Sequence, residues 1–191
     1  MSRSAALAIA FVLCWAIGTT CEDVFAASPR IVEFEAAPQP PGLQQRLVRE
    51  REKVPGDRLR GYLAKPEGDG PFPSLVAVHG CAGLPEAVVQ SASEPAVSSG
   101  YVMLLVDSFT TRAIDHTCTP DRYRAVDISK RTLDAYAALL FLARQPFVDV
   151  HRVAVVGASQ GGMVTLSLAQ GHARNLFVNP DNLAFRAGIA L

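Results

Sequence analysis

The pentapeptide Gly157-Ala158-Ser159-Gln160-Gly161 constrains this chain more than any other feature, because of the residues on either side of it. An apolar run rich in valine precedes it at residues 152–156, and a segment compatible with a helix follows at residues 163–169. A continuous hydrophobic run is typical of a buried parallel strand. Gly-x-Ser-x-Gly between such a strand and a helix predicts a nucleophile elbow, a tight turn that lifts the serine hydroxyl above the sheet.

Three residues around the serine support this interpretation. Gly157 and Gly161 lack a Cβ at the positions where the strand and helix backbones would pass too close for one. The N–H of Gln160, at the start of the helix, would point at the oxygen that becomes negative in acyl transfer. The motif therefore predicts Ser159 as a nucleophile and Gln160 as one backbone donor of an oxyanion hole.

Composition limits the class of protein. A chain of 191 residues with 49% hydrophobic content predicts one globular domain with a sizeable core. The formal net charge is zero, so nothing in the composition indicates a nucleic-acid or anionic partner. The sequence contains no His/Cys cluster with metal-ligand spacing and no phosphate-binding glycine loop, so we expect neither a metal nor a cofactor.

The first residues have the pattern of an export signal. Arg3 precedes an apolar stretch of 16 residues at 5–20, which is short for a membrane span, and small residues suited to cleavage surround Ala26. We expect residues 1–26 to be a signal peptide and the mature protein to be periplasmic or secreted, without a membrane span. The alternative is an uncleaved membrane anchor.

Export changes the interpretation of the cysteines. Cys14 and Cys21 would leave with the signal peptide, so that only Cys81 and Cys118 remain. An even pair in an oxidising compartment suggests a disulfide, and both residues follow predicted strands at the same edge of the sheet. The alternative is two free thiols.

The remaining segments predict an α/β fold. Residues 27–44 are interpreted as a surface segment with one short strand at 31–35, and residues 45–191 as the folded domain. Residues 45–53 and 58–65 are expected to form an antiparallel hairpin around the turn at 54–57. Buried strands are predicted at 74–78 and 101–106, and another strand at 185–191. Strands that alternate with helices predict a mostly parallel sheet covered by helices on both faces.

Two helices are predicted between these strands. Pro95 would break a long helix, so a short one is expected at 94–99. Thr119-Pro120 has the chemistry of an N-cap followed by proline at the first helical position, and predicts a helix that continues to about residue 144. Its apolar face would carry Leu133, Tyr136, Ala137 and Leu140.

A second turn at the same edge follows the strand at 74–78, in the segment His79-Gly80-Cys81-Ala82-Gly83. In the architecture that contains a nucleophile elbow, the second oxyanion donor is a backbone N–H at this place. We therefore predict the N–H of Cys81 as that donor. A disulfide to Cys118 would help to hold it in position.

Three segments together resemble a known family: the turn just described, Val106-Asp107-Ser108-Phe109, and the elbow extended to Gly162. They are similar to the exported, dienelactone-hydrolase-like branch of the α/β-hydrolase fold, over residues 45–191. The resemblance implies a hydrolase of small-molecule esters or lactones with a nucleophile–histidine–acid triad and no metal. The best-known dienelactone hydrolases carry cysteine where this chain has Ser159, so the prediction goes no further than an ester or acyl bond.

The acid and the histidine of the implied triad are not found after the serine at the places where this fold has them. In this fold the acid and the histidine follow the nucleophile in the sequence, after two later strands. Asp181 is the only acidic residue after Ser159, and His172 is the only histidine after it. Neither is expected at the edge of the sheet where the elbow lies. The four histidines are interpreted as loop or structural residues: His79, His116, His151 and His172. We therefore expect a truncated domain that lacks its last strands and helix, or alternatively a non-catalytic binding remnant; the oligomeric state stays open.

Charged residues in the loop after residue 106 carry weaker predictions. Asp107 is expected to tie down this loop. Arg112 and Arg122 could meet a substrate carboxylate, but solvation, or pairing with Asp115 and Asp121, is favoured.

Overall fold

The computed structural model of the chain describes residues 28–36, 57–123, 126–170 and 183–191. Several predictions lie outside these residues: the signal peptide at 1–26, the strand at 45–53, His172 and Asp181.

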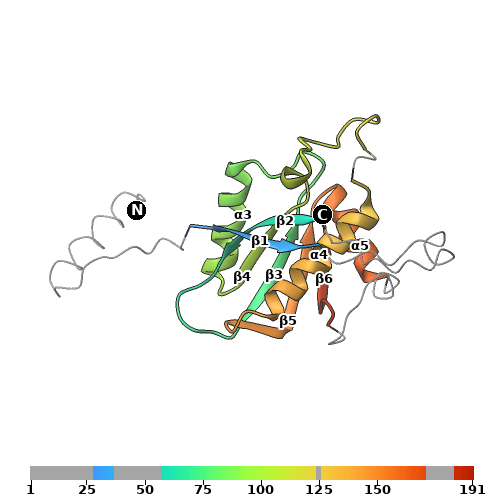
Figure 1. Cartoon of the computed structure of the whole chain (residues 1–191). Coiled ribbons are helices and arrows are strands. Elements are labelled where there is room, and N and C mark those ends of the chain that lie inside the picture. The colour runs from blue at the N-terminus through green and yellow to red at the C-terminus, as the bar shows by residue number, and fades with distance from the viewer. Residues whose placement is uncertain (1–27, 37–56, 124–125, 171–182) are drawn as a thin grey trace, which may run out of the picture.

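A six-stranded sheet forms the centre of the molecule, in the order β1-β2-β4-β3-β5-β6 (Figure 1). Strands β4, β3, β5 and β6 run parallel, whereas β2 is antiparallel to both β1 and β4. The strands are β1 Arg30–Glu35, β2 Arg58–Ala64, β3 Phe72–Val78, β4 Val102–Asp107, β5 Val148–Gly157 and β6 Ala187–Ala190. The helices are α3 Glu86–Ser98, α4 Ile128–Ala143 and α5 Gln160–Ala169, with the short 3₁₀ helix η1 at Thr110–Arg112.

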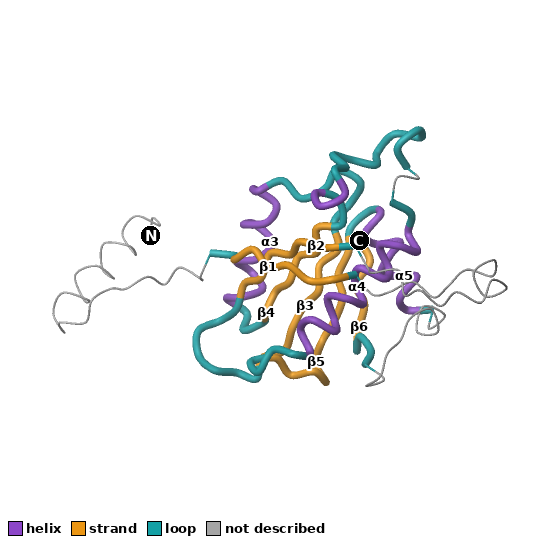
Figure 2. Tube along the Cα trace, viewed as in Figure 1, coloured by secondary structure: helices purple, strands orange, loops and turns teal. Residues whose placement is uncertain are grey.

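Helices cover both faces of this sheet, as Figure 2 shows. Residues of β4 alternate between two apolar clusters. Val102, Leu104 and Val106 belong to the large cluster that contains buried apolar residues of α4 and α5. Met103 and Leu105 point the other way, into a smaller cluster with residues of α3. A strand that is apolar on both faces explains the continuous hydrophobic run in its sequence, and the predicted α/β fold is confirmed.

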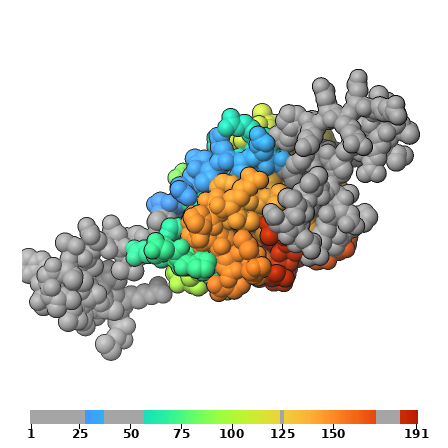
Figure 3. Space-filling model, turned by 60° about the horizontal axis from the view of Figure 1, so that its bottom comes forward, coloured from blue at the N-terminus to red at the C-terminus, as the bar shows by residue number. Residues whose placement is uncertain are grey.

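The two edge strands, β1 and β6, lie at the molecular surface (Figure 3). All four residues of β6 are exposed, although the strand pairs with β5 along its length. Ala187 lies opposite Ala154, and Ala190 lies opposite Gly157. Among the described residues, no helix combines the length and the apolar character needed to cross a membrane.

The prediction of a short helix at 94–99 was wrong, because α3 extends from Glu86 to Ser98. Pro95 lies near the end of this 13-residue helix, where the missing N–H removes one hydrogen bond rather than interrupting several turns. Burial of Val89, Ala96 and Val97 stabilises the helix on both sides of the proline.

The predicted N-cap at Thr119 was also wrong. The carbonyl of Thr119 accepts the N–H groups of Arg122 and Tyr123, which closes a single turn. The long helix α4 begins only at Ile128, where the side chain of Asp127 accepts the N–H of Lys130 at 2.8 Å. Both sites have N-cap chemistry, and the apolar residues at helical spacing that join the main cluster follow only the second one.

The predicted partner of residues 58–65 was wrong as well. One edge of β2 pairs with β1, so that Arg58 lies opposite Glu35 and Leu63 lies opposite Arg30. The other edge of β2 pairs with β4. Both edges of β2 are therefore occupied, and a hairpin with residues 45–53 has no place in the sheet. The antiparallel pair at this end of the sheet is formed with the strand predicted at 31–35.

Candidate active site

Ser159 stands in a strained turn between β5 and α5. Its backbone has φ 55° and ψ −120°, a conformation that non-glycine residues rarely adopt, and its side chain is exposed. A Cβ on Gly157 would lie 2.1 Å from the carbonyl oxygen of Gly161, and one on Gly161 would lie 2.0 Å from the carbonyl oxygen of Val78. The two glycines are therefore required by close backbone contact, and the geometry is that of the predicted elbow.

The second predicted turn lies beside this one. Strands β3 and β5 are parallel neighbours, with Val78 opposite Gly157, so that the turns after them meet at the same edge of the sheet. A Cβ built on Gly80 would lie 3.5 Å from the Cβ of Ser159. The structure therefore brings the backbone before Cys81 against the serine.

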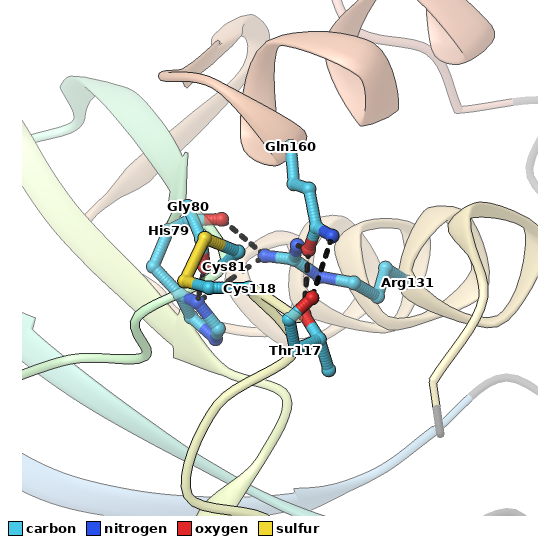
Figure 4. The surroundings of a disulfide bond; sticks show 7 residues. All are labelled: His79, Gly80, Cys81, Thr117, Cys118, Arg131 and Gln160. Atoms are coloured by element: carbon cyan, nitrogen blue, oxygen red, sulfur yellow. Dashed lines mark hydrogen bonds between the residues drawn. A yellow bond between two sulfur atoms is a disulfide. The ribbon is translucent and has the colours of Figure 1, made fainter. Parts of the chain in front are cut away.

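Cys81 and Cys118 are joined by a disulfide, with their Cα atoms 4.9 Å apart (Figure 4). The bond connects the turn after β3 to the loop after β4. The N–H of Thr117 donates to the carbonyl of Cys81 at 2.8 Å and makes a second connection between the same two segments. The turn that carries Cys81 is thus held from the side by a covalent bond and a hydrogen bond.

His79 shapes this turn. The N–H of Ser108 donates to its Nε2 at 3.3 Å, so the ring proton belongs on Nδ1, which donates to the carbonyl of Gly80 at 2.7 Å. Burial, and then the charge of Arg131, lower the pKa of His79 to about 4. The neutral ring has both nitrogens engaged by the backbone, which excludes His79 as a base for Ser159 in this arrangement.

Asp107 ties down the loop after β4, as predicted, because its Oδ1 accepts the N–H groups of Phe109 and Thr110 at 3.0 Å each. The prediction for Arg112 was wrong. Its guanidinium donates to both oxygens of Asp134, at 2.7 and 2.8 Å, and to Asp57 at 2.7 Å.

The prediction for Arg122 is partly confirmed, because its Nη1 lies 3.8 Å from Asp115. Asp115 and Arg122 are both exposed at this contact, so the pair contributes little to stability.

Two further histidines take different positions relative to the elbow. His151 lies near the beginning of β5, whereas Ser159 follows the end of that strand, and its Nδ1 lies 3.4 Å from Arg186. His116 lies in the loop that leads to the disulfide, and its Nδ1 has no hydrogen-bond partner in the described part of the chain. The structure therefore brings the segment of Cys81 and the residue Gln160 to Ser159 and leaves His151 away from them, whereas His116 directly precedes Thr117, whose hydroxyl donates to Gln160.

The sequence reasoning missed a buried polar cluster behind the two turns. The guanidinium of Arg131 donates to the carbonyl of His79 and, at 3.2 Å, to Oε1 of Gln160. The same Oε1 accepts the hydroxyl of Thr117 at 2.8 Å. A signal was present, because Arg131 is followed at helical spacing by the buried residues Ala135, Ala138 and Leu142, and an arginine in line with an apolar stripe indicates a buried charge.

No group of three or more His, Cys, Asp or Glu side chains arranged to hold a metal ion occurs among the residues that the structure describes.

Residues 59–176 match the model of the dienelactone hydrolase family. Two curated relatives are the thiohydrolase aneE of Aspergillus aculeatus, 32% identical over 61% of this chain, and the esterase FrsA of Escherichia fergusonii, 33% identical over 78% of it. The chain spans 35% and 33% of the lengths of these two proteins.

Solved structures share the fold. A proposed dienelactone hydrolase of Klebsiella pneumoniae superposes with a TM-score of 0.56 at 20% identity, covering 84% of this chain and 59% of the other. The acylaminoacyl peptidase of Pyrococcus horikoshii superposes with a TM-score of 0.52 at 22% identity, covering 85% of this chain and 22% of the other. At these identities the likeness concerns the arrangement of the backbone.

Proposed function

Because the chain belongs to the dienelactone hydrolase family, we propose that it is a serine hydrolase that cleaves an ester or lactone of a small molecule. The single observation that carries the proposal is the strained, exposed Ser159 between β5 and α5. A side chain that is exposed and held by a fixed backbone turn is available to a substrate, which reduces the reorganisation needed for attack.

In the proposed reaction, Oγ of Ser159 attacks the carbonyl carbon of the substrate. The serine loses its proton to a general base, the carbonyl oxygen becomes negative, and the alcohol leaves with a proton to form an acyl-enzyme. Water then attacks the acyl-enzyme, and the acid is released while the serine regains its proton. His79 is not the proposed base, since its nitrogens are engaged with Ser108 and Gly80.

We assign the oxyanion hole to the N–H groups of Cys81 and Gln160. Gln160 is the first residue of α5, and N–H groups in the first turn of a helix have no partner within the helix. The positive end of the helix dipole lies at the same place. The proximity of Gly80 to Ser159 supports the assignment of Cys81, because the next N–H along the turn belongs to that residue.

A fluorophosphonate probe tests the proposal, because it reacts with an activated serine in a site that stabilises an oxyanion. We expect intact-mass analysis of the folded protein to show one added group, and peptide mapping to locate it on Ser159. Ser159→Ala should abolish labelling. Ser91→Ala, which removes an exposed serine of α3, should not change it.

Two results would contradict the proposal: a folded wild-type protein that stays unlabelled, or equal labelling of the Ser159→Ala variant. The first result would favour a non-catalytic binding module with the same sheet. If Ser159 is labelled, a parallel assay with a nitrophenyl ester, a lactone and a thioester shows which of these substrate classes the protein cleaves.

Export to the periplasm or the medium is a further part of the proposal. Arg3 and the apolar stretch at 5–20 support it, and the disulfide between Cys81 and Cys118 fits an oxidising compartment. Fractionation of cells that express the chain, followed by N-terminal sequencing, should give a product beginning after Ala26 or Ala27. An unprocessed product in the cytosolic fraction would contradict it.

A further inference from the structure

Arg131 is a fully buried arginine that forms no ion pair with any carboxylate described in the structure. Its relative exposure is 0%, and no carboxylate in the described part of the chain lies within ion-pair distance of its guanidinium. Asp134, one turn along α4, uses both oxygens for Arg112. Burying an unpaired charge is expensive, so a protein that retains one at this place is expected to use it.

The guanidinium makes its hydrogen bonds to neutral acceptors on two separate segments. One nitrogen, Nη2, donates to the carbonyl of His79, at the end of β3. The other, Nη1, donates to Oε1 of Gln160, at the start of α5. Figure 4 shows the guanidinium between these two segments, with Thr117 completing the cluster.

These contacts connect both segments that carry the proposed oxyanion donors. The carbonyl of His79 precedes the N–H of Cys81 by two residues, and Gln160 itself carries the other N–H. We propose that Arg131 is a positioning residue that holds the N–H groups of Cys81 and Gln160 in the relative geometry that the oxyanion requires. This inference rests on the proposed function and deepens it.

An arginine suits this position better than a lysine. The planar guanidinium presents two nitrogens in fixed directions, so one side chain reaches both acceptors at once. The centroid of the Phe109 ring lies 5.2 Å from Cζ of Arg131, a cation–π contact that also helps to hold the guanidinium in place. The buried positive charge also lies behind both donors, where it favours the negative charge that develops on the substrate oxygen.

The test compares three variants of the full chain. Arg131→Met removes the charge and both hydrogen bonds, whereas Arg131→Lys keeps the charge but can reach only one acceptor. Thr132→Val is the matched control, because Thr132 is buried in the same helix and its hydroxyl donates only within that helix, to the carbonyl of Ile128.

We expect kcat for a nitrophenyl ester, and the rate constant for fluorophosphonate labelling, to fall roughly 100-fold in Arg131→Met, as for the loss of an oxyanion donor. The fall should be about tenfold in Arg131→Lys, since a single charge-assisted hydrogen bond is lost. KM should change less than about twofold, because the donors act on the transition state rather than on the bound substrate. Thr132→Val should retain wild-type kcat and labelling.

A second readout does not depend on activity. In ¹⁵N-labelled protein, the amide signals of Cys81 and Gln160 should shift, and exchange faster with deuterium, in Arg131→Met but not in Thr132→Val. Unchanged signals in a folded Arg131 variant would overturn the inference, as would equal losses of kcat in the arginine variants and the control. If Arg131→Met does not fold, Arg131→Lys carries the same comparison.

The two proposals can fail separately. A wild-type protein that is neither labelled nor active contradicts the hydrolase, while the amide signals still decide whether Arg131 positions the two N–H groups.

Discussion

Acidification should destabilise this protein through His79. Burial and the charge of Arg131 lower the pKa of this imidazole from its ordinary 6.5 to about 4 in the folded protein. In the unfolded chain the ring is solvated and titrates at its ordinary value. Between these two pKa values the unfolded state binds a proton that the native state does not bind, so the free energy of unfolding falls as the pH falls.

The magnitude follows from the difference between the two pKa values. One pKa unit corresponds to about 1.4 kcal/mol, so the complete effect amounts to about 3 kcal/mol once the pH is below both values. Above the ordinary pKa the contribution of His79 no longer changes with pH. Between about pH 7 and about pH 4.5 the expected loss is roughly 2 kcal/mol, because most of the window has then been crossed.

The assay is urea unfolding at these two pH values, for the wild type and for His79→Gln. Glutamine stays neutral throughout, and its amide can accept from Ser108 and donate to Gly80 as the imidazole does. The carboxylates titrate in both proteins, so their contribution cancels in the comparison. The wild type should lose roughly 2 kcal/mol more than the variant between about pH 7 and about pH 4.5.

A matched control is His151→Gln, which removes an exposed histidine in the first half of β5, away from His79. The control should lose as much stability on acidification as the wild type does. The same pH dependence in the wild type and in His79→Gln would refute the reasoning, because His79 would then bind its proton equally in both states.

Three further variants test the close contacts around the elbow and the disulfide. Gly161→Ala places a Cβ 2.0 Å from the carbonyl oxygen of Val78, and we expect a loss of about 3 kcal/mol or more in urea unfolding. Gly80→Ala meets its neighbours only at 3.5 Å and should be tolerated; equal losses would contradict the steric argument. Replacing Cys81 and Cys118 together by serine opens a loop with a sequence separation of 37, which should lower the free energy of unfolding by about 4 kcal/mol. An oxidised wild type that unfolds at the same urea concentration as the double variant would argue against a constraining bond.

The strands in the middle of the sheet were predictable because their surroundings leave a signal in the sequence. The parts of β3, β4 and β5 at 74–78, 102–106 and 153–157 lie in the middle of the sheet, between helices on its two faces, so their residues are almost all apolar. The elbow was predictable because its five-residue pattern is local, although only Gly157 is required by a contact within the turn, whereas Gly161 is required by the carbonyl of Val78 in β3.

Errors arose where two local patterns competed. Thr119 and Asp127 both have N-cap chemistry, and only the packing of α4 against the sheet selects the second. Pro95 is unfavourable in a helix, yet the buried face of α3 retains it. For β2, the hairpin turn at 54–57 suggested a sequential partner, whereas β1 and β4 occupy both of its edges.

The sequence by itself determined the α/β class, the elbow around Ser159 and the two cysteines that can form a disulfide, because these depend on periodicity and on residues close together in the chain. Only the tertiary structure decided which groups surround the proposed oxyanion donors. His79 and Arg131 are 52 residues apart, and Arg131 and Gln160 are 29 apart. Their hydrogen bonds exist because β3, α4 and α5 pack side by side, and a contact between distant segments leaves no periodic pattern in a single sequence.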